Sequence, residues 1–560
     1  MNFYSEDLHF KRLFQKYCDE DMFEWADREL QEFGALCGTE IDMRAVHTDR
    51  EGQPRLIKYD RMGNDVSEVW VNEGYLKTVE QVYNKGIVGY VHKTIPKIGR
   101  KADYFYSYAQ GYLLSQTEPG FYCPVTLTMA TAYLLEQYAD ETVRDRFLPH
   151  VISTGETELY EGATFLTERQ GGSDVGANET RAVAGDEAGV FYLTGEKYFA
   201  SNAGMCGVAM VLARMEGARP GTKGLSLFAV PWRNEDGSLN GISIRRLKDK
   251  LGVRAVPSAE VEFSGAKAYL VGDPSKGIHY MMEALNLSRV CNAVASIGIM
   301  RRAYLEARKY AVDRSAFGKK LIEYPMIKES LTHLAVKQEV ETSAIFRLIP
   351  LFSKVMDPSR GASDREKVMN RLLIAILKKE SAEQSIHFAH EAIEMHGGNG
   401  FIEDFVTPRL LRDAQVLTVW EGTANILGLE VLRLMNRFHA HNIFIQEMET
   451  ELAQLSARLT ETAKPVLEGL ESLKEMCSFM VQQSEDVQTL YAKKGAKLMA
   501  DIFESVTVLS EAASGTERDF MKAELFLTQT WKSGHDVDTE MKVLKYFEVI
   551  VLEKQNKAVR

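Results

Sequence analysis

A chain of 560 residues with 45% hydrophobic side chains can bury a large core, and its length predicts about three or four domains. The formal net charge of -12 disfavours nucleic acid as a partner. The six cysteines are spread singly, which predicts no metal site and favours a reducing cytoplasm. We find neither a signal-peptide pattern nor a long uninterrupted apolar run, so we expect no membrane span.

Apolar residues recur at three and four positions over residues 1–160, which predicts an N-terminal helical domain. From Glu161 the pattern changes to short β-rich runs, such as FYLTGEKYF and GLSLFAVPW, separated by Gly, Pro and Asn turns. These runs predict a small middle antiparallel β-domain over residues 161–275.

Helical spacing returns over residues 276–440, where we predict a second helical bundle, and continues over residues 441–560 as an appended helical domain with a turn near Ser533–Asp536. Helices, then strands, then helices indicate an α+β, mostly α fold rather than a doubly wound sheet. No G-x-G-x-x-G follows a strand, so a nucleotide cofactor would have to be held in another way.

Two segments in and before the β-rich region have the composition of ligand-binding elements. FLTERQGGSD (165–174) contains a glycine pair that would let the backbone approach a ligand closely, although an ordinary turn into a strand would read the same. In GEKYFASNA (195–203), alternation places Phe199 and Ser201 on one side of a strand, where they could pack on and hydrogen-bond a flat ring. The alternative is a core aromatic residue and a strand-end cap.

Two further segments lie in the second helical region. YAVDRSAFGKKL (310–321) offers Arg314 as a phosphate partner beside the ring of Phe317, or simply a helix end with a surface arginine. IEMHGGNGFIEDFVTPRLLRDAQVLTVWEGTANI (393–426) joins a Gly-rich turn to a helix and then to Trp420 and Glu421. Glu421 could be only a carboxylate near a helix N-terminus, which the helix dipole stabilises.

In this order, the four segments resemble the acyl-CoA dehydrogenase family, whose members show T-E-P-G-x-G-S-D, G-x-K-x-[WF]-I-[ST]-N, R-x-x-F-G, G-G-x-G-[FY] and Y-E-G-T. The resemblance covers about residues 120–435. It implies the acyl-CoA dehydrogenase-like fold, FAD as cofactor and an acyl-CoA substrate. Because the family shares cofactor sites between chains, it also implies a homodimer or homotetramer.

The resemblance assigns individual residues to these sites. The flavin ring would be cradled by Thr164, Leu166, Thr167, Ser173, Phe199 and Ser201, with Thr167 and Ser201 hydrogen-bonding it. The FAD of a neighbouring subunit would meet Arg314, Ser315, Ala316, Phe317, Glu394, Gly397 and Gly398, and Gly422, Thr423 and Asn425 would hold the pyrophosphate end. The CoA moiety would contact Ser173, Asn286, Ser288 and Arg289.

Desaturating a thioester requires a base for the α-proton and an acceptor for the β-hydride, which flavin supplies. The family places a glutamate at the position of Glu421, and a minority places the base directly before the CoA-binding arginine, where this chain has Ser288. The expected base is therefore Glu421. Electrons would pass to an electron-transferring flavoprotein, or to oxygen if the protein is an acyl-CoA oxidase. A third reading is a non-catalytic flavoprotein scaffold.

Three departures resemble the AidB-like branch, the alkylation-response flavoproteins. Arg169 and Gln170 replace Pro-Gly, Trp420 replaces the usual Tyr, and Pro325 replaces a common glutamine; RLKDKLG is also shared with that branch. Some members bind DNA and show poor dehydrogenase activity. Residues 441–560 hold 14 Lys and Arg against 20 Asp and Glu, which argues against phosphate binding, so we expect this section to cover a subunit face.

Overall fold

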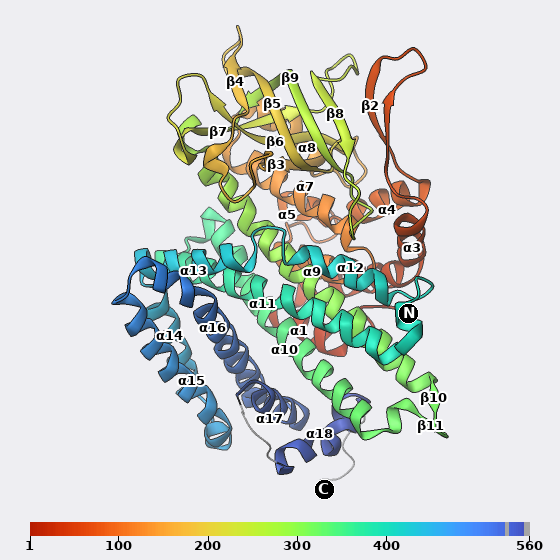
Figure 1. Cartoon of the computed structure of the whole chain (residues 1–560), viewed down its shortest axis with the longest axis vertical. Helices are drawn as coiled ribbons and strands as arrows, with labels where there is room; N and C mark the ends of the chain where they lie inside the picture. The colour runs from red at the N-terminus through yellow and green to blue at the C-terminus, as the bar shows by residue number, and fades with distance from the viewer. Residues whose placement is uncertain (532–536, 554–560) are drawn as a thin grey trace. The chain divides into compact units, whose positions relative to one another are not determined.

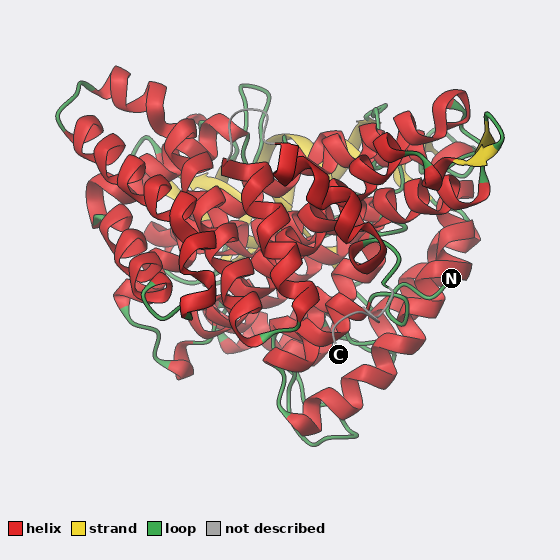
Figure 2. Ribbon diagram, turned by 90° about the horizontal axis from the view of Figure 1, so that it is seen from below, coloured by secondary structure: helices red, strands yellow, loops and turns green. Residues whose placement is uncertain are grey.

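The computed structural model describes residues 1–531 and 537–553, so the expected turn at Ser533–Asp536 lies outside the described residues. By packing, the chain divides into two units, one of residues 1–8 and 18–291 and the other of residues 9–17 and 292–560. The second unit is almost entirely helical, whereas the first combines helices with the strands of the main sheet. Figure 2 draws helices in red and strands in yellow. Within the described ranges, no helix is both long and apolar enough to cross a membrane.

The helices of the first unit surround two that are buried on every side. Every residue of α6 is buried, as are those of α7 up to Leu135 except the half-buried Cys123, and helices apolar on all faces belong in a protein interior. Asp19, Asn72 and Asp140 cap α2, α4 and α8 with side-chain oxygens, which fixes where these helices begin. The helices are α2 (Glu20–Leu36), α3 (Asp42–Arg50), α4 (Glu73–Asn84), α5 (Gly89–His92), α6 (Tyr104–Ser115), α7 (Pro119–Tyr138) and α8 (Glu141–Val151), with a π-helical turn at Cys37–Ile41.

A two-stranded hairpin interrupts residues 1–160, for which helical periodicity predicts helices throughout. β1 (Arg55–Tyr59) pairs antiparallel with β2 (Asp65–Trp70). Lys58 donates to Ser243 at 2.6 Å, and Ser67 accepts from the backbone N–H of Ile244 at 2.8 Å, so the hairpin is attached to strand β8 (Ile242–Leu247) of the main sheet. Short hairpins are marginal alone, which explains this support.

The main sheet has seven strands, and part of it closes on itself. β7 pairs with both β9 and β6, so the path β6–β4–β5–β9–β7 returns to its first strand, while β3 adds to β6 and β8 to β9 (Figure 1). Helix α7 packs against β3. The strands are β3 (Glu161–Phe165), β4 (Arg181–Ala184), β5 (Val190–Ser201), β6 (Cys206–Met215), β7 (Leu225–Pro231), β8 (Ile242–Leu247) and β9 (Ser258–Leu270).

The prediction of an antiparallel β-domain was wrong in one respect, because the sheet is mixed. β3 and β4 both run parallel to β6. Antiparallel pairing is favoured where a short turn joins neighbouring strands, as between β4 and β5. β3 reaches β6 only after a long loop and two other strands, so no turn fixes its direction, and turn chemistry in the sequence could not show it.

The second unit is a bundle of long helices, to which helix α9 (Gly277–Asp313) contributes its C-terminal part. Pro325 is the first residue of α10, a position where the missing N–H is harmless, which accounts for this departure from the family pattern. Ser363 begins α11 with a reciprocal capping box to Glu366. The other elements are α1 (Leu8–Tyr17), β10 (Ser315–Ala316), β11 (Lys319–Lys320), α10 (Pro325–Met356), α11 (Asp364–His396), α12 (Thr407–Leu417) and α13 (Ala424–Phe438).

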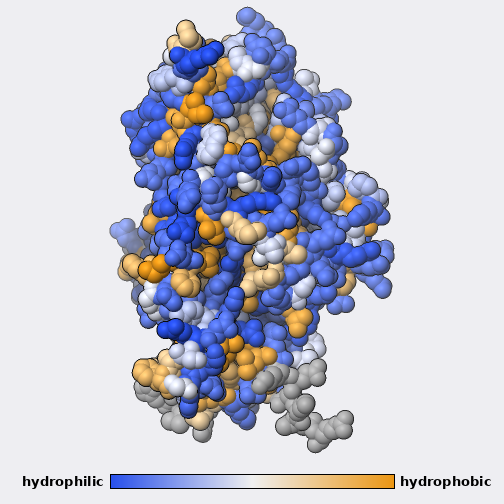
Figure 3. Space-filling view, turned by 90° about the vertical axis from the view of Figure 1, so that its right-hand side faces the viewer, coloured by the Kyte–Doolittle hydropathy of each residue, from blue (hydrophilic) through white to orange (hydrophobic). Residues whose placement is uncertain are grey.

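The appended helices belong to this second unit and are not a separate body. Helix α16 packs against α10, α11 and α13, and α17 and α18 pack against α10. These helices are α14 (Ala440–Leu452), α15 (Ala457–Val481), α16 (Glu485–Ser514), α17 (Glu517–Trp531) and α18 (Val537–Ile550). On the face drawn in Figure 3, hydrophobic residues lie scattered among hydrophilic ones. The four domain limits stay predictions.

Candidate functional site

The first two motifs lie side by side in the first unit. The backbone N–H of Tyr198, on β5, donates to the carbonyl of Thr167 at 2.9 Å. Asn178 donates from Nδ2 to the carbonyl of Leu166 at 2.8 Å, so the loop that follows β3 is tied at Leu166 and Thr167, two of its three residues expected to touch flavin. Thr164 and Thr167 are half-buried, and Ser173 is exposed further along the loop.

A buried ion pair joins these motifs from behind. Lys197 Nζ lies 2.7 Å from Glu168 Oε1, with side chains 0% and 4% exposed, and it also donates to the Leu212 carbonyl at 2.9 Å. Glu168 accepts the hydroxyl of Thr180 at 2.6 Å and the N–H of Glu179 at 2.6 Å. Burial alone would raise the pKa of Glu168, but the Lys197 ammonium and these donors lower it. The pair therefore fixes the loop against β5.

Phe199 and Ser201 point to the same side of β5, as alternation predicts. Ala200 between them is fully buried, while the Phe199 ring is 55% exposed and Ser201 is half-buried. The ammonium of Lys248 lies 4.4 Å from the centroid of the Phe199 ring and 3.4 Å from that of Tyr198, which is close cation–π contact. An exposed aromatic face beside a hydroxyl suits a flat, polar-edged ring.

Side-chain contacts hold the loop where the family pattern has Pro-Gly. Arg169 forms a two-pronged pair with Glu196, at 2.8 and 3.0 Å, and Gln170 donates to Asn178 Oδ1 at 3.0 Å. Proline restricts a loop through its ring. Here Arg169 and Gln170 restrict it through partners on β5 and at the end of the loop, so these departures are structurally consistent with an ordered loop.

Three of the four residues expected to bind CoA lie on the N-terminal half of α9, also in the first unit; the fourth, Ser173, is on the loop after β3. Arg289 donates to Asn286 Oδ1 at 3.1 Å, three residues earlier and thus on the same helix face. Ser288 and Arg289 are 3% and 5% exposed, and Asn286 is half-buried. The hydroxyl of Tyr108 donates to the Leu287 carbonyl at 3.3 Å and anchors this part of the helix.

In the second unit, the C-terminal end of α9, which leads into the hairpin β10–β11, is linked to the Gly-rich turn after α11. The Tyr310 ring lies 4.2 Å from that of His396, and Asn399 donates from Nδ2 to the Tyr310 hydroxyl at 3.1 Å. At the tip of the hairpin, Phe317 has a left-handed backbone and is 99% exposed. Arg314, Ser315, Glu394, Gly397 and Gly398 are exposed, and Ala316 is half-buried.

Glu421 occupies a strained turn between α12 and α13. Its φ of +60° lies in the left-handed region, which is unfavourable for a residue with a Cβ, and Gly422 follows with φ +107°. Lys378, from the buried face of α11, donates to the Gly422 carbonyl at 2.8 Å. Thr423 is the N-cap residue of α13, and Thr423 and Asn425 are exposed. Strain held in place by a buried lysine indicates a functional turn.

The residues predicted to bind FAD have the side chains and the open backbone that this cofactor needs. Exposed aromatic faces at Phe199 and Phe317 offer stacking surfaces, and Arg314 offers a cation for phosphate. A Cβ at Gly172 would lie 2.5 Å from the Thr167 hydroxyl, and nothing lies within 4 Å of one at Gly397 or Gly398. The loop therefore needs glycine at 172, and the later turn presents open backbone.

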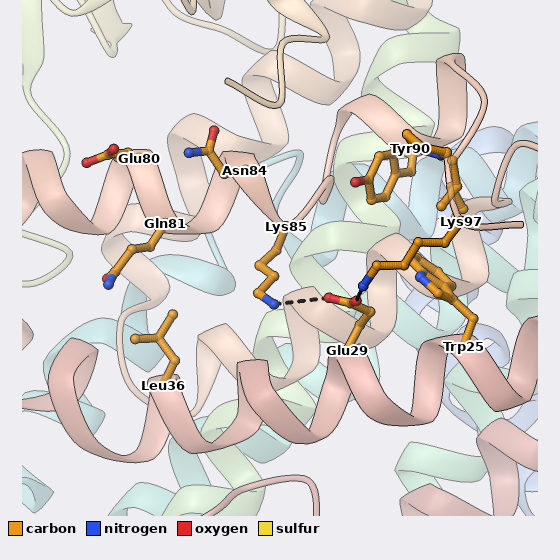
Figure 4. A pocket seen from close by; sticks show the side chains of 11 residues that line it. Trp25, Glu29, Leu36, Glu80, Gln81, Asn84, Lys85, Tyr90 and Lys97 are labelled. Carbon is orange, nitrogen blue, oxygen red and sulfur yellow. Dashed lines mark hydrogen bonds and ion pairs between the residues drawn. The ribbon is translucent and has the colours of Figure 1, made fainter. Parts of the chain in front are cut away.

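A pocket of about 580 Å³ lies elsewhere in the first unit, between α2, α4 and the loop 95–97 (Figure 4). Its walls are residues that the sequence did not single out. Glu29 projects into it and pairs with Lys85 at 3.0 Å and Lys97 at 2.8 Å. Burial would raise the pKa of Glu29, but the two ammonium groups lower it. Because Glu29, Lys85 and Lys97 already pair within the wall, this pocket is a weaker candidate for an ionic ligand.

Sequence reasoning missed the residues behind the motifs. Glu168 and Lys197 belong to the two motifs, but the sequence predicts no role for either. Simple alternation places Lys197 on the same side of β5 as Phe199 and Ser201, and the irregularity of the strand between Lys197 and Ala200 turns it to the buried side instead. For Lys248 and Lys250, the sequence predicts only that RLKDKLG is shared with the AidB-like branch. The residues assigned to FAD and CoA stay predictions at the positions described.

Three family models together match most of the chain. They are the adaptive response protein AidB N-terminal domain over residues 1–155, the acyl-CoA dehydrogenase middle domain over residues 163–266, and the acyl-CoA dehydrogenase C-terminal domain over residues 275–436. The fold expected from the sequence is confirmed by these matches. Their order also follows the helical, β-rich and helical parts of the structure.

Individual relatives support the same family. Acyl-CoA dehydrogenase family member 11 of Caenorhabditis elegans is 32% identical over 86% of this chain and 79% of its own length. The putative acyl-CoA dehydrogenase AidB of Escherichia coli is 32% identical over 74% of this chain and 75% of its own. The crystal structure of Caenorhabditis elegans ACDH-11 in complex with C11-CoA superposes with a TM-score of 0.87 over 100% of this chain and 96% of that one, at 27% identity. The chain therefore belongs to the acyl-CoA dehydrogenase family, in its AidB-like branch, and is an FAD-dependent oxidoreductase.

Proposed function

We propose that the protein removes hydrogen from the α and β carbons of an acyl-CoA thioester, with Glu421 as the base. The observation that carries this proposal is the Glu421 turn, where a left-handed glutamate is followed by a glycine whose carbonyl a buried lysine holds. A carboxylate is the kind of base that this reaction needs, and Ser288 offers none at the alternative position.

The chemistry divides between the chain and its cofactor. Bound FAD supplies an acceptor for the hydride of the β-carbon, because no side chain can accept one. Glu421 takes the α-proton onto a carboxylate oxygen, and its backbone N–H polarises the thioester carbonyl, which makes that proton more acidic. Asn286 and Arg289 hold the CoA moiety. An acyl-CoA substrate is supported by the relative whose structure is in complex with C11-CoA.

The test is an anaerobic titration of the purified yellow protein with straight-chain and branched acyl-CoAs, following bleaching of the flavin. We expect Glu421→Gln to keep FAD and to slow flavin reduction by about 10²- to 10⁴-fold, the range for loss of a general base. Glu383→Gln is the matched control, since this exposed glutamate on α11 pairs with Lys379 and should leave the rate unchanged. A native rate in Glu421→Gln would place the base elsewhere.

Electron transfer to an electron-transferring flavoprotein completes the proposal. Rates measured with that acceptor and with oxygen separate it from the oxidase alternative, since dominant peroxide production would mean an oxidase. DNA binding is disfavoured by the acidic balance of residues 441–560. No bleaching by any acyl-CoA in the panel would favour a non-catalytic scaffold, and a cytoplasmic location stays a prediction.

We also propose a homodimer or homotetramer that shares FAD between chains. Phe317, at the tip of the hairpin, is 99% exposed, and Phe401, in the Gly-rich turn, is 81% exposed. Large aromatic side chains left in water are typical of surfaces that another molecule covers. Light scattering of the FAD-bound protein and of Phe317→Asp tests this. A monomeric native protein that binds FAD would contradict it.

A further inference from the structure

The second lysine of RLKDKLG is held by an array of acceptors. Lys250 Nζ donates to the carbonyl of Val253 at 2.8 Å, to that of Val256 at 2.6 Å and to the hydroxyl of Ser258 at 3.2 Å. An ammonium group can only donate hydrogen bonds. In the contact with Lys250, Ser258 Oγ must therefore be the acceptor, so its own hydrogen is directed elsewhere.

A second hydroxyl lies where that hydrogen can go. Ser258 begins β9, where it faces Ser201 at the end of β5, and the two Oγ atoms are 3.3 Å apart. Ser258 is 4% exposed, so water does not compete freely for its hydrogen, whereas Ser201 is half-buried on the exposed side of β5. A hydroxyl has one hydrogen and two lone pairs. If Ser258 donates to Ser201, the hydrogen of Ser201 is left to point outward.

We propose that Lys250 and Ser258 form a relay that sets Ser201 as a hydrogen-bond donor toward the flavin ring. The proposal rests on the proposed function and on the flavin lying at Ser201, as the family resemblance predicts. Lys250 and Ser258 are then positioning residues, which act through Ser201 and do not touch the cofactor. A donor held in this way favours an acceptor atom at the ring edge, and without the relay the Ser201 hydroxyl can rotate and accept instead.

The relay also accounts for a motif that the catalytic assignment leaves aside. The two lysines of RLKDKLG approach the two predicted flavin residues of β5 separately, Lys248 at the ring of Phe199 and Lys250 through Ser258 at Ser201. Both come from the segment between β8 and β9, so one short segment supports both residues.

The experiment compares Ser201→Ala, Ser258→Ala and the double variant as purified FAD-bound proteins. Ser258→Ala is preferred to a change at Lys250, whose loss would free three acceptors and endanger folding. The readouts are the visible absorption spectrum of the flavin, its reduction potential and the FAD dissociation constant, with thermal unfolding measured separately. Ser264→Ala is the matched control, because Ser264 lies on the same strand but is exposed.

We expect Ser258→Ala to shift the spectrum and the potential in the same direction as Ser201→Ala and to weaken FAD binding by about 2- to 12-fold, the range for one hydrogen bond. The double variant should resemble Ser201→Ala alone, since both changes break one chain. If Ser258→Ala only lowers the unfolding temperature and leaves the flavin unchanged, or if the two effects add, the relay is refuted. If Ser201→Ala itself has no effect on the flavin, the placement of the cofactor at Ser201 fails instead.

Discussion

Replacing glutamate by glutamine should change the stability of the protein very differently at two buried positions of the second unit. Glu504, on α16, lies in a cluster in which Lys337 Nζ is 2.7 Å from Glu504, 2.9 Å from Glu341 and 3.2 Å from Glu380, and the three carboxylates are at most 1% exposed. Glu339, on α10, instead accepts two bonds from Arg518, at 2.6 and 2.8 Å. We expect Glu504→Gln to leave stability nearly unchanged and Glu339→Gln to lower it strongly.

The difference follows from the charge that each site can stabilise. At Glu504, burial and the neighbouring carboxylate of Glu341 raise the pKa well above its usual value, against the effect of Lys337. The Lys337 ammonium already faces all three carboxylates, and the pKa of Glu380 is lowered to about 2 by Lys337 and Lys497 in spite of burial. Lys497 also pairs with Glu380 at 3.1 Å, so Lys337 is left to balance Glu341 and Glu504, and we expect Glu504 to hold a proton. Glutamine has nearly the same shape as a protonated glutamate.

At Glu339 the neighbouring cations outweigh the effect of burial on the pKa. Burial would raise its pKa, but Arg518, His9 and Lys522 hold the pKa well below the usual range, so the side chain is ionised. Removing one partner from a buried, hydrogen-bonded ion pair costs about 3–5 kcal/mol, because the other charge stays buried. Lys337→Met should cost about as much, since it leaves the carboxylates of the cluster without their shared cation.

The contributions of Glu504 and Glu339 to stability also change with pH in opposite directions. A raised pKa in the folded state means that the contribution of Glu504 is complete below the unfolded pKa and is lost as pH rises through the folded one. The lowered pKa of Glu339 means that its contribution is present above the unfolded pKa and is lost as pH falls. Native protein should therefore lose the Glu504 contribution progressively as pH rises from the unfolded pKa to the raised folded pKa, and Glu504→Gln should remove that loss.

Denaturant unfolding at acidic, neutral and alkaline pH measures these effects, and the infrared carbonyl band of a protonated carboxyl group, absent from Glu504→Gln, reports the proton directly. The reasoning is refuted if Glu504→Gln and Glu339→Gln destabilise equally at neutral pH. It is also refuted if metal analysis finds a cation that Glu504→Gln removes, since the three carboxylates have ligand atoms within 4.8 Å of one another.

Further predictions concern the first unit. Lys197→Met should lower the free energy of unfolding by about 3–5 kcal/mol and weaken FAD binding, because it leaves Glu168 charged and buried; retained stability in denaturant would contradict this. Arg169→Ala should cost at most about 1 kcal/mol, since Arg169 is 62% exposed, and a larger loss would show that the loop depends on it. Burial raises the pKa of Glu161 to about 7, so stability should fall as pH rises from near 4 through 7, and Glu161→Gln should flatten that slope in pH-dependent unfolding.

The sequence predicted the helix, strand and helix order because hydrophobic periodicity and turn residues are local signals. It placed Phe199 and Ser201 on one side of a strand for the same reason, and the burial of Ala200 agrees. It could not show that β3 runs parallel to β6, because that pairing joins distant segments. The supports behind the site were also hidden: nothing local connects Lys378 with Gly422, or Lys250 with Ser201, before the chain folds.

The left-handed backbone of Glu421 has a consequence for protein engineering. Glycine adopts this conformation freely, whereas a residue with a Cβ loses about 1–2 kcal/mol there. Glu421→Gly should therefore produce an inactive protein that resists denaturation at least as well as the native one. The native sequence keeps a side chain at a position where the backbone favours glycine, so selection for thermal robustness alone would tend to erase the proposed base.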